Sequence, residues 1–295
     1  MWIGNGVQAR PTRDYGAACA AFERLAARDG PEISDVGRSR FFGHGKRTAR
    51  AVVLLHGLTN APAQWVPFAE RLHAHGDTVV IPRFPGHGFA NRRTHRIARV
   101  HANDFLGIAS EAVDIACGAG ERVVLAGLSI GGAIAAWLAL ARAELDRSVA
   151  VVPFLGVARL PERGNRILTT ALVALPNAFI PWDPGGGNKE IPPYAYASFP
   201  THVLGACLAV GLDALRRSAT QAPRGRLELA LNAREPACNN ALAEKMNARL
   251  RAQRPDASGL VVWPDLPPIH DIVDPSNPHG RTDLVYPRLR ALVDG

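Results

Sequence analysis

The chain has 295 residues, of which 47% are hydrophobic, and this is enough to bury the core of one large α/β domain. Its formal charge of +8 comes mostly from arginines, but these are spread along the sequence without a basic run or interleaved aromatic side chains. Nucleic-acid binding is therefore not expected. Residues 123–141 approach the length of a membrane span, but Ser129 and three glycines interrupt them, which favours a strand, a turn and a helix instead.

The cysteines and the N-terminus bear on the cellular compartment. Four cysteines are scattered along the chain without C-x-x-C spacing, which indicates free thiols in a reducing environment. Residues 1–6 do not begin a charged stretch followed by an apolar one, so no secretory signal peptide is evident. We therefore expect a cytoplasmic protein.

The first half of the chain alternates between predicted strands and helices. In chain order we predict a helix at 14–27, strands at 39–42 and 51–55, a helix at 65–75, a strand at 78–81, a helix at 104–116, a strand at 123–126, a helix at 132–138 and a strand at 149–152. This alternation predicts an α/β fold with a mainly parallel central sheet flanked by helices.

The alternation stops near residue 154, where proline, glycine and aromatic residues become frequent. We interpret residues 155–222 as an inserted cap with helical stretches near 165–174 and 203–217. The sheet pattern then resumes with a strand at 227–231, a helix at 238–253, a strand at 259–263 and a last helix at 281–293. The predicted organisation is an N-terminal extension over 1–35, core segments over 36–154 and 223–295, and the cap between them.

The pentapeptide Gly127-Leu128-Ser129-Ile130-Gly131 carries the clearest chemical signal. It joins a predicted strand to a predicted helix, which is the setting in which G-x-S-x-G forms a nucleophile elbow. Such a turn holds the serine in a strained conformation with its hydroxyl clear of the sheet. Only small residues fit two positions before and after it, because the strand and helix pass close together there. Ser129 is the predicted nucleophile.

A serine hydroxyl needs a base, an acid that orients this base, and donors for the oxyanion. The donors are predicted to be the N–H groups of Leu58, which follows His56-Gly57 after an early strand, and of Ile130. Two histidines, His270 and His279, follow the last strand and qualify as the base, and we favour His270 because apolar neighbours flank it.

The acid should follow the strand at 227–231, because the chain order at such sites is serine, acid, histidine. Glu235 is the only carboxylate in the loop 232–240 and is the predicted acid. Asp265 and Asp271 lie in the same segment as His270 and are the alternatives. The sequence contains no H-E-x-x-H, no cysteine–histidine cluster and no G-x-G-x-x-G, so neither a metal nor a dinucleotide is expected.

Five segments together resemble the α/β-hydrolase superfamily, in its branch of small carboxylesterases and monoacylglycerol-lipase-like serine hydrolases. They are His56-Gly57-Leu58-Thr59, Pro85-Gly86-His87-Gly88, Gly127-Leu128-Ser129-Ile130-Gly131-Gly132, residues 232–240 and His270-Asp271-Ile272-Val273. The resemblance spans roughly residues 40–295. The chain departs from it at Glu235, where the family usually has aspartate.

The resemblance implies an α/β-hydrolase fold and hydrolysis of small to medium acyl esters through an acyl-enzyme. In that scheme His270 takes the proton of Ser129, Glu235 orients His270, and no cofactor is needed. The expected partner is a small-molecule ester. His56, Trp65 and Trp182 are candidate substrate-binding residues, and cap aromatics are candidate pocket walls. The alternatives are a thioesterase, a monoacylglycerol lipase, an acyltransferase, a lipase attracted to anionic membrane surfaces by its basic charge, and a non-catalytic ligand-binding relic.

Overall fold

The computed structural model describes residues 7–183 and 191–295. These residues form a seven-stranded sheet of order β1-β3-β2-β4-β5-β8-β9, in which only β1 runs antiparallel to its neighbour. The strands are β1 (Arg40–Phe42), β2 (Thr48–Leu55), β3 (Thr78–Ile81), β4 (Gly120–Leu128), β5 (Leu145–Val151), β8 (Arg226–Asn232) and β9 (Ser258–Trp263). The prediction of a mainly parallel α/β sheet is confirmed.

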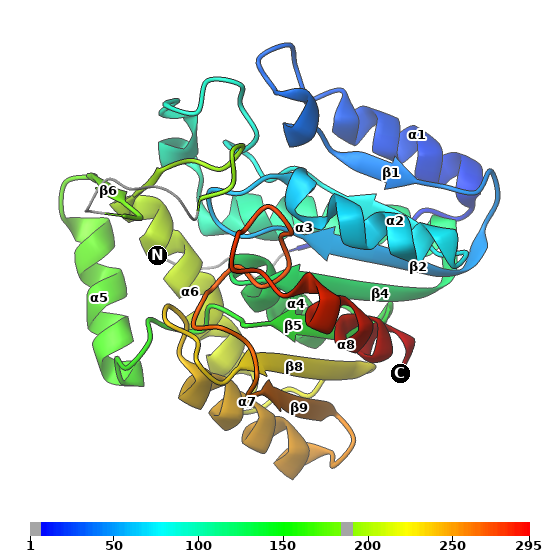
Figure 1. The fold of residues 1–295 in the computed structure, drawn as a ribbon. Coiled ribbons are helices and arrows are strands. Elements are labelled where there is room, and N and C mark those ends of the chain that lie inside the picture. Colours follow the sequence, from blue (N-terminus) through cyan, green and yellow to red (C-terminus); the bar gives the residue numbers. More distant parts are fainter. Residues whose placement is uncertain (1–6, 184–190) are drawn as a thin grey trace.

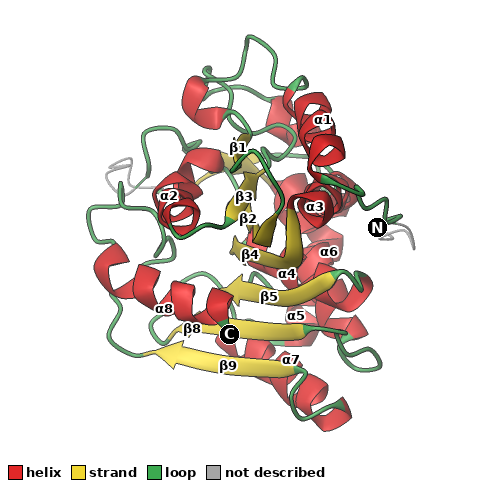
Figure 2. Cartoon of the chain, turned by 90° about the vertical axis from the view of Figure 1, so that its right-hand side faces the viewer, coloured by secondary structure: helices red, strands yellow, loops and turns green. Residues whose placement is uncertain are grey.

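Helices cover both faces of the sheet, which is why the central strands are apolar on both sides (Figures 1 and 2). Val52 and Leu54 pack against α2 (Val66–Ala74) on one face, whereas Val53 and Leu55 belong to the core of the other face. The first face is completed by α8 (Thr282–Asp294). The second is covered by α1 (Tyr15–Ala26), α3 (Ala102–Ala119), α4 (Ile130–Ala141), α6 (Thr201–Arg217) and α7 (Asn240–Gln253).

The segment between β5 and β8 contributes both a cap and part of the core. Its α5 (Glu162–Ala174) has one buried residue, and β6 (Phe179–Pro181) pairs with β7 (Ser198–Pro200) in a small ribbon. In contrast, α6 packs on α4, and ten of its residues are buried. The helix predicted at 203–217 therefore contacts both the core helix α4 and the cap helix α5. Residues 184–190 of the predicted cap and 1–6 of the predicted extension lie outside the described residues.

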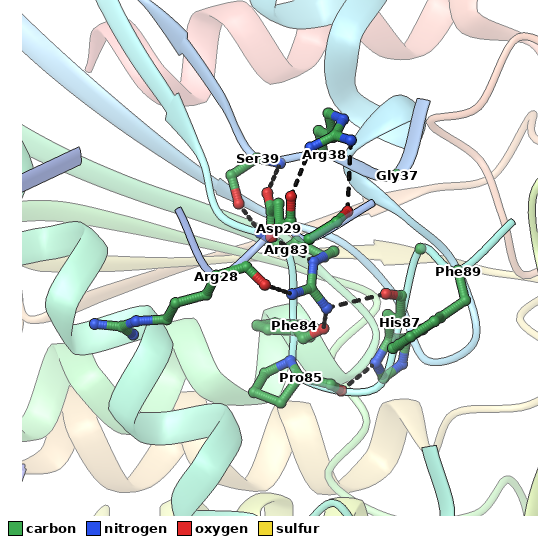
Figure 3. Close-up of polar contacts among 12 residues, drawn as sticks. Arg28, Asp29, Gly37, Arg38, Ser39, Arg83, Phe84, Pro85, His87 and Phe89 are labelled. Atoms are coloured by element: carbon green, nitrogen blue, oxygen red, sulfur yellow. Dashed lines mark hydrogen bonds and ion pairs between the residues drawn. The ribbon is translucent and has the colours of Figure 1, made fainter. Parts of the chain in front are cut away.

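The N-terminal extension is integrated into the core through α1 and the turn that follows it. Ala18 and Leu25 of α1 are buried against α3. Beyond the helix, Asp29 accepts hydrogen bonds from the Ser39 backbone at 2.7 Å and from Arg83 Nε at 2.6 Å (Figure 3). Arg83 also donates to the carbonyl of His87 at 3.1 Å. This buried ion pair connects the extension to the loop 83–89 that follows β3.

Candidate active site

Ser129 lies at the sharp turn between β4 and α4. Its backbone has φ 60° and ψ −116°, a left-handed φ that a non-glycine residue adopts at a cost and that marks functional turns. The turn is held on both sides, because the Ser129 N–H donates to the Val151 carbonyl at 3.0 Å and its own carbonyl accepts from Phe154 at 2.9 Å. The strained backbone is thus fixed by the neighbouring strand β5.

The glycines around Ser129 are required by the close approach of strand and helix. A Cβ at Gly127 would lie 2.3 Å from the backbone of Gly131, and a Cβ at Gly131 would lie 2.3 Å from the Leu55 carbonyl oxygen. A Cβ at Gly132 would lie 2.9 Å from the Val151 carbonyl. The sequence argument for small residues at this turn therefore has a direct steric basis.

The loops that follow β8 and β9 bring Glu235 and His270 together. Glu235 Oε1 lies 2.8 Å from His270 Nδ1 and also accepts the N–H groups of Ala237 and Cys238, at 2.8 and 3.1 Å. The Glu235 side chain is fully buried, whereas the His270 side chain is 28% exposed. An N–H at Nδ1 that donates to the carboxylate leaves Nε2 as the acceptor, which is the tautomer that a general base needs.

The electrostatics of this pair favour a carboxylate beside an imidazolium. Burial disfavours the charge on Glu235, but the neighbouring His270 and the two backbone donors outweigh it, so the pKa of Glu235 is lowered. Burial likewise disfavours a charged His270. The Glu235 carboxylate, with Cys238 acting in the same direction, nevertheless holds the pKa of His270 well above its ordinary value. The pair therefore stabilises an imidazolium at His270.

Cys238 is a third functional group at this position, and nothing in the sequence pattern points to it. Its buried sulfur lies 3.9 Å from His270 Nδ1. Burial, which dominates over the influence of His270 and Ser129, raises the pKa of the Cys238 thiol. Among the described residues, the Ser129 hydroxyl forms no hydrogen bond with His270. Such contacts are often long in ligand-free enzymes and shorten when the substrate binds.

Ser129 and His270 line one cavity of about 610 Å³. Leu58, which follows β2, and Trp182, from the segment between β6 and β7, also line it. The N–H of Ile130 is the first of α4, and neither it nor the N–H of Leu58 donates a hydrogen bond within the described part of the chain. Both are therefore available to a ligand oxygen. The remaining lining residues are Gly57, Thr59, Asn60, Leu128, Asp183, Ile191, Pro192, Ala195, Pro236, Pro268, Ile269, Asp271 and Asn277.

Gln64 connects the loop after β2 to the loop that carries His270. Its Oε1 accepts the N–H of Gly57 at 2.8 Å, and its Nε2 donates to Asp271 Oδ2 at 2.7 Å. Asn60 Nδ2 donates to the same oxygen at 3.1 Å. Burial, reinforced by the nearby Asp274, raises the pKa of Asp271 to about 6. Because the backbone N–H can only donate, the orientation of the Gln64 amide is fixed.

Two of the three predicted substrate-binding residues do not reach the cavity. His56 is fully buried, with Nδ1 2.9 Å from the Gly57 carbonyl and Nε2 accepting from the Phe84 N–H at 3.1 Å. Trp65 is also fully buried and donates to the Leu55 carbonyl at 2.9 Å. Their packing positions the loop after β2 instead. Trp182 does line the cavity and donates to Thr59 Oγ1 at 2.8 Å.

The alternative acids and base occupy other positions. Asp265 is exposed and forms an ion pair with Arg288 at 2.6 Å, on the surface. Asp271 contacts Asn60 and Gln64 in the cavity wall. His279 is not among the residues that line the cavity, and its backbone N–H donates to Asn277 Oδ1 at 3.0 Å. Of the candidates from the sequence, Glu235 and His270 are the two whose side chains meet beside the cavity.

This combination of parallel sheet, strained serine turn and histidine–carboxylate pair can be compared with known proteins. The alpha/beta hydrolase family matches residues 52–293. The chain belongs to this family. No curated protein sequence matches the chain significantly. Among the residues that the structure describes, no helix has both the length and the apolarity needed to cross a bilayer.

Solved structures described as lipolytic enzymes and lipases share the fold at low sequence identity. One, described as LipS and LipT, two metagenome-derived lipolytic enzymes, has a TM-score of 0.68 at 18% identity and covers 89% of this chain and 99% of its own. A Paleococcus ferrophilus monoacylglycerol lipase has a TM-score of 0.65 at 16% identity, and the match covers 87% of this chain and 98% of the lipase. A soluble variant of Saccharomyces cerevisiae monoglyceride lipase has a TM-score of 0.68 at 13% identity, and the match covers 87% of this chain and 91% of the lipase.

Proposed function

We propose that the protein is a serine hydrolase of carboxylic esters, in which Ser129 is the nucleophile, His270 the general base and Glu235 the acid that orients it. The observation that supports this most is the Glu235–His270 contact of 2.8 Å beside a cavity that also contains the strained Ser129 turn. Each group has the chemistry that its role requires. The geometry of this alpha/beta hydrolase, rather than its solved relatives, supports the proposed role of the pair.

In the acylation half-reaction, His270 Nε2 accepts the hydroxyl proton of Ser129 while Oγ attacks the ester carbonyl carbon. The carbonyl oxygen becomes an oxyanion and accepts hydrogen bonds from the N–H groups of Leu58 and Ile130. Glu235 stabilises the imidazolium. His270 then returns the proton to the leaving alkoxide, the C–O bond breaks, and the alcohol departs from an acyl-Ser129 ester.

Deacylation repeats these steps with water. His270 takes a proton from a water molecule, whose oxygen attacks the acyl carbon, and the same two N–H groups hold the second oxyanion. The proton returns to Ser129 Oγ as the acid is released. In each half-reaction, His270 thus accepts one proton and later donates it. We propose small to medium acyl groups, because a cavity of about 610 Å³ lies within the range that small-molecule sites occupy.

The test is the hydrolysis of p-nitrophenyl esters from acetate to palmitate by the full-length chain and by Ser129→Ala. The expected result is turnover in the wild type that falls on the order of 10³-fold or more in the variant. Ser148→Ala is the matched control. Ser148 is also a buried serine, but it lies on β5 away from the cavity, and its hydroxyl has no partner among the described residues.

The acyl chain length that is hydrolysed fastest would indicate the size of the acyl pocket. Equal activity in the wild type and Ser129→Ala would overturn the nucleophile. A wild type that is inactive on all esters, but that cleaves an acyl-coenzyme A, would favour a thioesterase with the same three residues. Inactivity on both classes of substrate would remove the proposed function.

A further inference from the structure

A set of potential metal ligands converges behind the proposed base. Glu235, Cys238 and His270 each offer one ligand atom, and these three atoms lie within 4.8 Å of one another. The residues come from the loop after β8 and the loop after β9, and Cys238 and His270 are 32 positions apart in the sequence. The sequence therefore contains no compact cysteine–histidine motif, although the fold brings the residues together.

The distances approach those of a bound transition-metal ion. Ligand atoms at roughly 2.0–2.3 Å from a tetrahedral zinc ion lie about 3.3–3.6 Å from one another. His270 Nδ1 is 3.9 Å from Cys238 Sγ and 2.8 Å from Glu235 Oε1, one slightly longer and one slightly shorter than this. His270 is in a loop, outside helices and strands. A shift of a few tenths of an ångström there would even out both distances.

The Glu235 carboxylate still has coordinating capacity. Its Oε1 is occupied by His270 and two backbone N–H groups, but its Oε2 is buried without a hydrogen-bond partner among the described residues. A buried carboxylate oxygen without a partner is uncommon and calls for an explanation such as an ion. This orphaned oxygen is a property of the Glu235 carboxylate that its contacts with His270 and the backbone do not explain.

We propose that Glu235, Cys238 and His270 form an inhibitory binding site for a thiophilic divalent cation of the zinc and cadmium class. One thiolate, one imidazole and one carboxylate suit zinc-like ions, whereas magnesium and calcium prefer oxygen ligands alone. With three protein ligands, the fourth coordination position is left for water. His270, which lines the cavity, provides the route of entry.

Inhibition follows from the chemistry of imidazole and rests on the proposed function. When the metal binds, the Cys238 thiol releases its proton to solvent, and a metal–sulfur bond forms. The metal also bonds to Nδ1 of His270 and displaces the proton there to solvent, so the neutral ring carries its single proton on Nε2. In that tautomer Nε2 is a donor and cannot accept the Ser129 proton. No oxidant or reductant is involved, and removal of the ion restores the original tautomer.

The experiment uses cadmium as the probe, because a cadmium–thiolate bond has its own ultraviolet charge-transfer absorption. Cadmium is titrated into the full-length protein while this band and ester hydrolysis are followed in parallel. We expect the band to saturate near one ion per chain as activity is lost, and EDTA to reverse both. Cys238→Ser should lack the band and need at least about tenfold more cadmium for half inhibition, since loss of even an outer-shell partner costs a metal site 10–100-fold.

Cys117→Ser is the matched control, because Cys117 is a partly exposed thiol on α3, away from the cavity. It should keep both the band and the inhibition. Equal inhibition of the wild type and Cys238→Ser, or a band that disappears in Cys117→Ser instead, would overturn the site. Cys238→Ala repeats the test if the serine variant does not fold.

The band also separates this inference from the esterase proposal. Ser129→Ala retains all three ligands and should bind cadmium as the wild type does, whatever reaction the protein catalyses. A band in the wild type that is missing in both Cys238 variants would support the metal site even if no ester is hydrolysed. Turnover without a Cys238-dependent band would support the esterase and refute the metal site.

Discussion

The ionisation of His270 should set the pH at which the protein works. A general base must be neutral before it accepts a proton, and the Glu235 carboxylate holds the pKa of His270 well above its ordinary value. We therefore expect kcat/KM for a p-nitrophenyl ester to rise with pH through a midpoint above about 6.5. In Glu235→Gln the imidazolium loses its anion, so its pKa falls. The midpoint should then move to lower pH while the maximal kcat also drops.

Asp265→Asn is the control for this prediction, because Asp265 is exposed and pairs with Arg288 on the surface. It should leave both the midpoint and the maximal rate near the wild-type values. The assignment of the acid would have to be abandoned if Asp265→Asn moved the midpoint and Glu235→Gln did not. The two profiles thus decide between the two acids that the sequence left open.

At the residue scale, the order of the strands in the sequence predicts which residues are candidates for the site. Glu235 and His270 were selected because each is in the loop after a late strand, and parallel strands bring such loops to one edge of the sheet. Cys238 belongs to the same edge, but nothing in the sequence separates a cysteine that faces a histidine from one that packs in the core. His56 and Trp65 illustrate the converse error, since residues beside the oxyanion loop need not point into the cavity.

At the scale of elements, Gln64 connects two loops that line the cavity. In Gln64→Leu, the N–H of Gly57 and one acceptor position of Asp271 lose their partner, which costs about 1–3 kcal/mol of unfolding free energy for each buried group left unsatisfied. The adjacent N–H of Leu58 would also lose its fixed position. We expect kcat to fall on the order of 10²-fold, since small misplacements have effects of that size.

Steady-state kinetics well below the unfolding temperature, together with urea unfolding, test this prediction. Gln253→Leu is the control, because Gln253 lies at the end of α7, donates to the Ser218 carbonyl and does not line the cavity. It should lose stability without a change in kcat. If Gln64→Leu behaves in the same way, Gln64 is only structural.

The elements of the sheet were more predictable than the segment inserted into it. The strand predicted at 78–81 coincides with β3. A short apolar run between polar turns is typical of a strand in a sheet that helices cover on both faces. The ribbon of β6 and β7 was not predicted, since its three-residue strands are too short to show periodicity. The sequence did not show that α6 packs on α4 as well as on α5, because an amphipathic pattern indicates a buried face but not the element that covers it.

At the scale of the whole molecule, buried neutral histidines connect stability to pH. His87 is fully buried, stacked with Tyr196 and next to Phe84 and Phe105 (Figure 3 shows its contact with Pro85). Burial, with the Arg83 charge acting in the same direction, lowers the pKa of His87 to about 4. The pKa of His56, buried beside it, is also lowered well below the usual value. Unfolding exposes both rings to water.

Acid should therefore destabilise the fold through His87. As the pH falls below about 6.5, the unfolded chain binds a proton at this position that the folded chain rejects until about pH 4. The contribution of His87 to the free energy of unfolding is thus complete near pH 7. Acidification removes this contribution, which amounts to about 3 kcal/mol. His87→Phe keeps an aromatic ring in place without a titrating group. Urea unfolding of both proteins at several pH values from 7 to 4 should show a shallower acid loss in the variant.

The comparison between variant and wild type separates the effect of His87 from that of groups whose contribution to stability changes with pH in the opposite direction. His270, whose pKa is raised, adds stability that is largest at low pH, and this term is common to both proteins and cancels in their difference. His75→Gln is the control, because His75 is an exposed histidine that follows α2 and lies outside the buried ring cluster around His87. A free-energy difference between wild type and His87→Phe that stays constant from pH 7 to 4 would contradict the prediction. The acid sensitivity would then have to arise from other groups, with the buried His56 as the next to test.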